Sequence, residues 1–171
     1  GSTGRDDGQY AAHSNWGPTD DPDTVNPNGY PTLKPQVLAP GVGIRSSING
    51  SDTQYGNKSG TSMSAPHVSG LIALMWGAAP CLVGDYATTE TLIQETAIPV
   101  PHASNCGGEG LGNVPNMAAG WGEIDAYAAV QAAIEHCHGD SLGWVEAEIV
   151  TGTLAPHQDL PVRVTFTCTP E

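Results

Sequence analysis

One serine in this chain stands where a hydroxyl could act as a nucleophile. Residues 60–70 read Gly-Thr-Ser-Met-Ser-Ala-Pro-His-Val-Ser-Gly, so Ser62 lies between a glycine-containing turn and an apolar helical run. A hydroxyl at a helix N-terminus is surrounded by backbone N–H groups that lack intrahelical partners, and these donors can stabilise an oxyanion on an attacked carbonyl. The segment predicts acyl-transfer chemistry, with Ser62 as the nucleophile and its backbone N–H in the oxyanion hole.

Ser62 also has a plain structural interpretation, because most serines at helix starts are only N-caps. A Gly-x-Ser-x-Gly nucleophile elbow is disfavoured, since Ser64 stands where the second glycine would be. His67 follows Ser62 by five residues, whereas neighbours on one helix face are three or four residues apart. We therefore interpret His67 as a buried structural histidine and not as the base.

Several predicted elements must position this serine. A helix is expected over residues 62–77; it is apolar nearly all round, which is typical of a central helix, and Pro66 is tolerable near its first turn. A second helix is expected over 88–97, capped by Thr88 or Thr89, and a last one over about 125–137, with Asp125 as N-cap. Together with a strand near 36–39 and an apolar-polar stretch over 44–48, this order predicts an α/β layered domain.

All eleven positions of residues 60–70 fit the nucleophile motif of the subtilisin-like serine proteases, which the segment resembles through Gly60, Thr61, Met63, Pro66 and His67 around Ser62. Residues 33–44 resemble the family's Lys-Pro-Asp-(apolar)-x-Ala-Pro-Gly segment, although Gln36 replaces the usual aspartate. Residues 120–126 are similar to the entry to the family's last helix. In the upstream match, residues 7–17, His13 replaces an aromatic residue, and we expect it at the surface or in packing.

The resemblance implies a fold and a division of the chain. Residues 1–139 are expected to form the C-terminal part of a subtilisin-like layered α/β domain with a mostly parallel sheet. Residues 140–171 are expected to form a linker and the first strands of an appended β-sandwich-like module, because apolar and polar residues alternate over 162–168.

The same resemblance implies a secreted serine endopeptidase that acts on protein or peptide substrates through Ser62. The family's base and carboxylate come from a His-Gly-Thr helix start and an Asp-x-Gly strand end, both N-terminal to the nucleophile. His-Gly-Thr does not occur in this chain, so the N-terminal half of the same domain is the expected partner. One alternative is a catalytically silent binding module without Asp and His. Another is a sedolisin-type acid peptidase with a glutamate base, which the sequence from Met63 to Gly70 disfavours.

Composition excludes several other functions. The 5 basic and 18 acidic residues leave a net charge of −13, which argues against nucleic acid and anionic membranes as partners, and no apolar run reaches spanning length. No zinc-ligand spacing occurs, and no cofactor is required by the predicted chemistry. The acidic loop over residues 20–32 is interpreted as a solvated turn-rich segment, with structural calcium as the alternative.

Four cysteines in an acidic chain that resembles a mostly secreted family indicate disulfides and an oxidising compartment. We expect Cys81 to pair with Cys106, which would join the loop after the first helix to the glycine-rich segment. Cys137 is expected to pair with Cys168, or Cys168 with a partner beyond residue 171.

Overall fold

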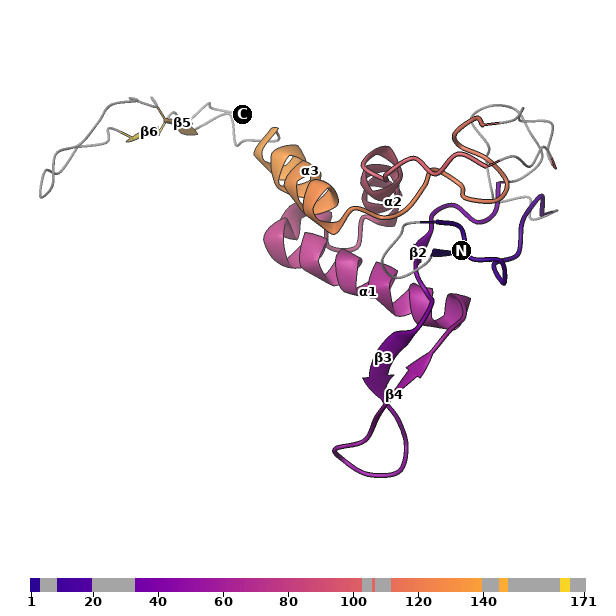
Figure 1. Ribbon diagram of the computed structural model, residues 1–171. Helices are drawn as coiled ribbons and strands as arrows, with labels where there is room; N and C mark the ends of the chain where they lie inside the picture. The colour runs from indigo at the N-terminus through magenta and orange to yellow at the C-terminus, as the bar shows by residue number, and fades with distance from the viewer. Residues whose placement is uncertain are drawn as a thin grey trace, which may run out of the picture.

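The computed structural model describes residues 1–3, 9–19, 33–102, 106 and 112–139, together with the backbone of two short strands further along the chain. The chain is a mixed α/β structure. Its helices are α1 (Thr61–Ala78), the 3-10 turn η1 (Pro80–Leu82), α2 (Tyr86–Glu95) and α3 (Ala126–Gly139). Figure 1 shows α1 as the longest helix, with α3 packed along it and a hairpin projecting from its start.

The predicted helix over 62–77 is confirmed as α1, with one more residue at each end. It stops before Pro80, because a residue that precedes proline disfavours the helical conformation. The expectation of burial all round is wrong for the described residues. Only Ser64, Leu71 and Met75 are buried, and Leu74 is 60% exposed, because the other described helices cover one side of α1.

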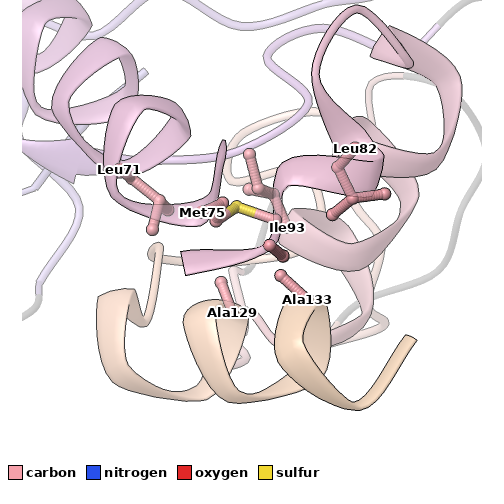
Figure 2. Packing of buried hydrophobic residues seen from close by; sticks show 7 residues of the cluster. Leu71, Met75, Leu82, Ile93, Ala129 and Ala133 are labelled. Carbon is pink, nitrogen blue, oxygen red and sulfur yellow. The ribbon is translucent and has the colours of Figure 1, made fainter. Parts of the chain in front are cut away.

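The apolar core lies where α1, η1, α2 and α3 meet (Figure 2). Two fully buried alanines of α3, Ala129 and Ala133, face α1 and let the two helix backbones approach closely. Burying a side chain the size of leucine or methionine contributes about 1.5–3 kcal/mol. This cluster therefore holds α1 in place from its middle to its C-terminal end. Its buried members are Leu71, Met75, Ala79, Leu82, Ile93, Ala129 and Ala133.

The helix predicted over 88–97 begins and ends two residues earlier, at Tyr86 and Glu95. Its N-cap is Asp85, so the assignment of Thr88 or Thr89 as the cap is wrong. The Asp85 carboxylate accepts hydrogen bonds from the Thr88 N–H (3.1 Å) and the Thr88 hydroxyl (2.7 Å). Thr89 is instead buried inside the helix, where its hydroxyl accepts a bond from the Trp76 indole at 3.0 Å.

The last helix is confirmed, and so is its cap. The Asp125 carboxylate accepts a hydrogen bond from the Ala128 N–H at 2.9 Å, which satisfies one of the free donors of the first turn. The helix runs to Gly139, two residues further than predicted. Ala129 and Ala133 point inward as expected, whereas Ala126 is exposed.

The strands of the described chain are short and form three pairs. The first two, β1 (Ser2–Thr3) and β2 (Ala39–Pro40), pair in parallel. A parallel bridge between Leu38 and Glu123 extends this layer, close to the strand predicted near 36–39. The stretch predicted over 44–48 is the first arm of an antiparallel hairpin, β3 (Ile44–Ser47) with β4 (Tyr55–Lys58).

The disulfide joins Cys81 to Cys137, with Cα atoms 5.9 Å apart. Both predicted pairs, Cys81–Cys106 and Cys137–Cys168, are therefore wrong. The reason is tertiary, because η1 and the last turns of α3 contact each other after the chain has returned along α1. Cys106 is exposed and stands outside this bridge.

Other predictions fall on residues that the structure does not describe. The acidic loop over 20–32 lies outside the described residues, as do most of residues 140–171. In the latter segment, β5 (Val145–Ala147) pairs antiparallel with β6 (Val164–Phe166), which lies within the predicted strand over 162–168. The division at residue 139 stays a prediction. In the described part of the chain, no helix has the length and apolar character needed to cross a membrane.

Candidate active site

The turn before α1 is built around Gly60. Its backbone has φ 147° and ψ 162°, a conformation that side-chain-bearing residues rarely adopt. The Gly60 carbonyl accepts the Met63 N–H at 2.9 Å, which closes the first turn around Ser62. Ser62 is exposed on this turn, among N–H groups that an α-helix leaves without intrahelical partners.

The partial positive charge at the N-terminus of α1 is not neutralised by side chains of the helix itself. Among the residues that the structure describes, no side chain makes a capping hydrogen bond at this end, and the first turn holds no acidic residue. The positive end of the helix dipole is therefore directed at whatever approaches Ser62. This is the electrostatic requirement for stabilising a developing oxyanion.

Gly41 connects this turn to the strands. Its N–H donates to the Thr3 carbonyl (3.0 Å), and its own carbonyl accepts the Gly60 N–H (2.8 Å). A Cβ at Gly41 would lie 2.2 Å from the Ser2 hydroxyl oxygen and 2.8 Å from the Gly60 carbonyl oxygen. Only a glycine fits here, so Gly41, directly after β2, sets the distance between the strands and the turn that carries Ser62.

Ser64 packs against the same glycine from within α1. Its side chain is buried, and its Oγ has no hydrogen-bond partner among the described atoms. The Oγ lies 2.3 Å from the position of a Gly41 Cβ. Sequence reasoning treated Ser64 only as a small residue of the motif, and nothing in the local pattern indicates that its hydroxyl would be buried.

Two clefts meet beside the helix start. The first, of about 410 Å³, is lined by the segment Lys34–Val37 and by the α1 residues Thr61, Ser64, Ala65, Val68 and Ser69, with Gly1 at its edge. The second, of about 310 Å³, lies between residues 13–16, Lys34 and Thr61. Thr61 lines both, so the surface next to Ser62 is hollowed on the side of residues 13–16 and 34–37.

Two histidines that could be considered as a base for Ser62, His67 and His13, have other partners. His67 is exposed, and its Nδ1 lies 2.8 Å from the Met63 carbonyl oxygen one turn earlier. The prediction that His67 is buried is wrong, because the described elements leave this side of α1 uncovered. His13 is exposed, as expected, and its Nε2 lies 3.2 Å from the Ser2 hydroxyl.

Pro66 is the sixth residue of α1, and the helix continues past it. Because proline has no N–H, it cannot bond the Ser62 carbonyl, to which residue 66 would otherwise donate. The structure thus brings together Gly60, Thr61, Ser62 and Met63 in one turn, with Pro66 and His67 on the following turn.

Sequence reasoning missed an aromatic cluster that supports the edge of the second cleft. The rings of Tyr10, Trp16 and His102 lie edge to face, with centroids 4.9 to 6.0 Å apart. The Trp16 indole donates to the Tyr10 hydroxyl, which donates to the Ser14 carbonyl. Only the two aromatic residues flanking His13 could have indicated this cluster, because His102 is distant in the sequence.

No group of three or more metal-ligating side chains occurs within the described residues. The acidic loop over 20–32, for which calcium was the alternative, is outside them.

Known proteins resemble this chain along most of its length. A sequence profile of the subtilase family (peptidase S8) matches residues 1–122. Bacillopeptidase F of Bacillus subtilis (strain 168) is 35% identical over 123 residues, which are 72% of this chain and 8% of that protein. The extracellular protease of Xanthomonas campestris pv. campestris is 38% identical over 103 residues, which are 57% of this chain and 16% of that protein.

Among solved structures, the CspB protease of Clostridium perfringens aligns with a TM-score of 0.44 and 24% identity, over 65% of this chain and 22% of that one. The chain thus spans less than a quarter of the length of these relatives. The family assignment depends on the sequence profile, which covers well over half of the chain and includes the whole segment from Gly60 to Gly70. This chain belongs to the subtilase family.

Proposed function

We propose that the protein containing this chain is a secreted serine endopeptidase in which Ser62 attacks the scissile carbonyl. The observation that carries the proposal is the complete motif from Gly60 to Gly70, with Ser62 exposed on the first turn of α1. The Ser62 backbone N–H contributes to the oxyanion hole. Gly60 and Thr61 set the turn that exposes both groups.

The base and its carboxylate come from another part of the same peptidase domain. Acyl transfer through serine requires both, since the hydroxyl is a weak nucleophile until a base removes its proton. The His-Gly-Thr motif that supplies the base in the family does not occur in these 171 residues. The described part of α1 also has an uncovered apolar side on which further elements of a mostly parallel sheet would pack.

Two further observations support secretion and protein substrates. The described residues contain a disulfide between Cys81 and Cys137, as is usual in oxidising compartments. The matched relatives include proteins named extracellular proteases.

A fluorophosphonate probe tests the assignment in the full-length protein. We expect one covalent adduct, mapped by peptide mass spectrometry to Ser62, and loss of both labelling and casein hydrolysis in Ser62→Ala. Ser51→Ala, at an exposed position between β3 and β4 and outside both clefts, is the matched control and should label normally. Labelling at another residue, or proteolysis that survives Ser62→Ala, would exclude Ser62; a folded protein that neither labels nor cleaves would indicate a silent binding module.

A further inference from the structure

Positive charge in this acidic chain gathers around the start of α1. Residues 33–78 hold three of the chain's five basic residues, Lys34, Arg45 and Lys58, and a single acidic one, Asp52. Residues 79–139 hold no lysine or arginine and seven acidic residues. The nucleophile turn therefore lies in a locally cationic part of a molecule whose net charge is −13.

The three cations, which we call the cationic rim, lie on two segments: residues 34–37, which share a cleft with Thr61, and the β3–β4 hairpin that precedes α1. Lys34 lines both clefts that Thr61 also lines. Lys58 ends strand β4, and Arg45 lies on strand β3 of the same hairpin. Figure 1 shows this hairpin leading directly into α1, with its connecting loop, which contains Asp52, at the end away from the helix.

The base of the hairpin is fixed to the nucleophile turn by hydrogen bonds. The Ser59 hydroxyl accepts the Gly43 N–H at 2.9 Å, and the Gly41 carbonyl accepts the Gly60 N–H at 2.8 Å. Lys58 precedes Ser62 by four positions, a span that cannot exceed about 15 Å between Cα atoms. Lys58 is thus held within reach of a peptide bound at Ser62.

Within the described part of the chain, Lys34 and Arg45 contact uncharged groups, which leaves their positive charges available to a ligand. The Lys34 ammonium donates to the Gln36 side-chain oxygen at 3.1 Å. The Arg45 guanidinium lies 4.5 Å from the centre of the Tyr55 ring. Lys58 is exposed and faces Ile44 across the ladder.

The position of Gln36 matters for this charge balance. Gln36 replaces the aspartate that is usual in the resembled segment. Its side-chain oxygen accepts from the Lys34 ammonium, and its side-chain NH₂ donates to the Glu90 carboxylate of α2. An aspartate here would place a second carboxylate close to Lys34 and Glu90. The substitution therefore leaves the rim less neutralised than the family pattern would.

We propose that the cationic rim of Lys34, Arg45 and Lys58 makes this enzyme prefer peptide substrates that carry a glutamate or aspartate next to the scissile bond. The proposal rests on the proposed function for its substrate, and the positive end of α1 adds to the same field. At physiological salt, exposed charges act over about 8 Å, so a charged substrate residue responds mainly to the rim cations that it approaches and little to acidic residues farther away. Acidic residues would contact the rim, and basic residues would be repelled from it.

The test compares cleavage of matched fluorogenic peptides by the full-length protein. The peptides differ by glutamate, glutamine or lysine on either side of the scissile bond, and the readout is the ratio of their kcat/KM values. We expect the ratio of glutamate to glutamine peptide to exceed about threefold, and each of Lys34→Gln and Lys58→Gln to reduce it by about two- to threefold. In 1 M salt the ratio should approach one, because screening extends to about 3 Å.

Gln131→Glu on α3 is the matched control, since it changes net charge as Lys→Gln does but at an exposed site on another helix; the ratio should not change. A wild-type ratio of one or less, or a ratio unaltered by both lysine variants, would overturn the rim while leaving the peptidase assignment intact. If the protein cleaves no peptide, the proposed function fails. In that case the role of the cationic rim is tested by measuring how tightly the Ser62→Ala variant binds the labelled glutamate and glutamine peptides. Equal affinities for the two peptides would overturn the proposed preference.

Discussion

At the scale of single residues, Gly41 and Gly60 determine where Ser62 stands. Gly60 supplies a backbone conformation with positive φ, and Gly41 supplies space, because oxygen atoms of Ser2, Ser64 and Gly60 surround its Cα. Neither role is chemical. Together, these two glycines determine whether the exposed Ser62 hydroxyl and the free N–H groups of the first turn of α1 are directed at the same bound group.

Replacing Gly41 by alanine should therefore destabilise the full-length protein by about 1–3 kcal/mol, the usual cost of overpacking a filled site. The added methyl would lie 2.2 Å from the Ser2 hydroxyl oxygen, so the strands and the helix start must separate. Denaturant unfolding measures the change. Gly70→Ala is the control, because no atom lies near its Cβ position and alanine favours a helix interior by up to about 1 kcal/mol. Equal stability of Gly41→Ala and wild type would contradict this account of the turn.

Asp85 acts through its charge at the start of α2. Hydrogen bonds from the side chain and then the backbone N–H of Thr88 hold the pKa of the Asp85 carboxyl below its ordinary value. Because the folded-state pKa is depressed, the contribution to stability is present above the unfolded-state pKa and is lost as pH falls through the folded-state pKa.

Asp85→Asn should lower the melting temperature at neutral pH, and the difference from wild type should shrink as pH falls below about 4. Thermal unfolding of the full-length protein between pH 7 and pH 3 measures this. Thr88→Ala removes the hydroxyl donor but keeps the N–H, so it should show the same trend with a smaller amplitude. A difference between Asp85→Asn and wild type that is constant with pH would show that the carboxylate charge is not involved.

At the scale of elements, the C-terminal end of α1 and the end of α3 are held together twice, once by the core around Met75 and once by the disulfide. The two cysteines lie 56 residues apart in the sequence. Closing a loop of this length is worth about 4 kcal/mol in the chain-entropy model. The disulfide should therefore be a large part of the stability of this helical layer.

Peptide mapping without reduction should recover Cys81 linked to Cys137. Cys81→Ser and Cys137→Ser should each lower the free energy of unfolding by about 4 kcal/mol, and the double variant should be no worse than either single one. Cys106→Ser, which leaves this bridge intact, should have little effect. Recovery of a Cys81–Cys106 peptide would contradict the observed pairing and restore the prediction from sequence.

At the scale of the whole molecule, these 171 residues contain the proposed nucleophile, and the proposal assigns the base to another part of the same peptidase domain. The two nearby histidines bond the Met63 carbonyl and the Ser2 hydroxyl, so neither is directed at Ser62. Members of a catalytic triad act as one unit, and loss of the base costs nearly as much as loss of the serine.

We therefore expect the isolated chain to hydrolyse no casein or peptide substrate at a rate that depends on Ser62. Mixing it with the remaining part of the peptidase domain should restore turnover if the two parts re-form the fold. Turnover by the isolated chain that disappears in Ser62→Ala would mean that His13 or His67 can act as the base after all. Ser62→Ala in the mixed sample serves as the control for contaminating proteases.

The sequence by itself determined the features that depend on short-range interactions. The position of α1, the cap at Asp125 and the motif around Ser62 are all readable locally, because helix caps and turns depend on residues within about four positions. The tertiary structure alone decided the partner of Cys81, the exposure of His67 and the close contacts of Gly41. These depend on which segments, distant in the chain, pack against one another, and such packing follows from the shape of the folded core and not from any local pattern.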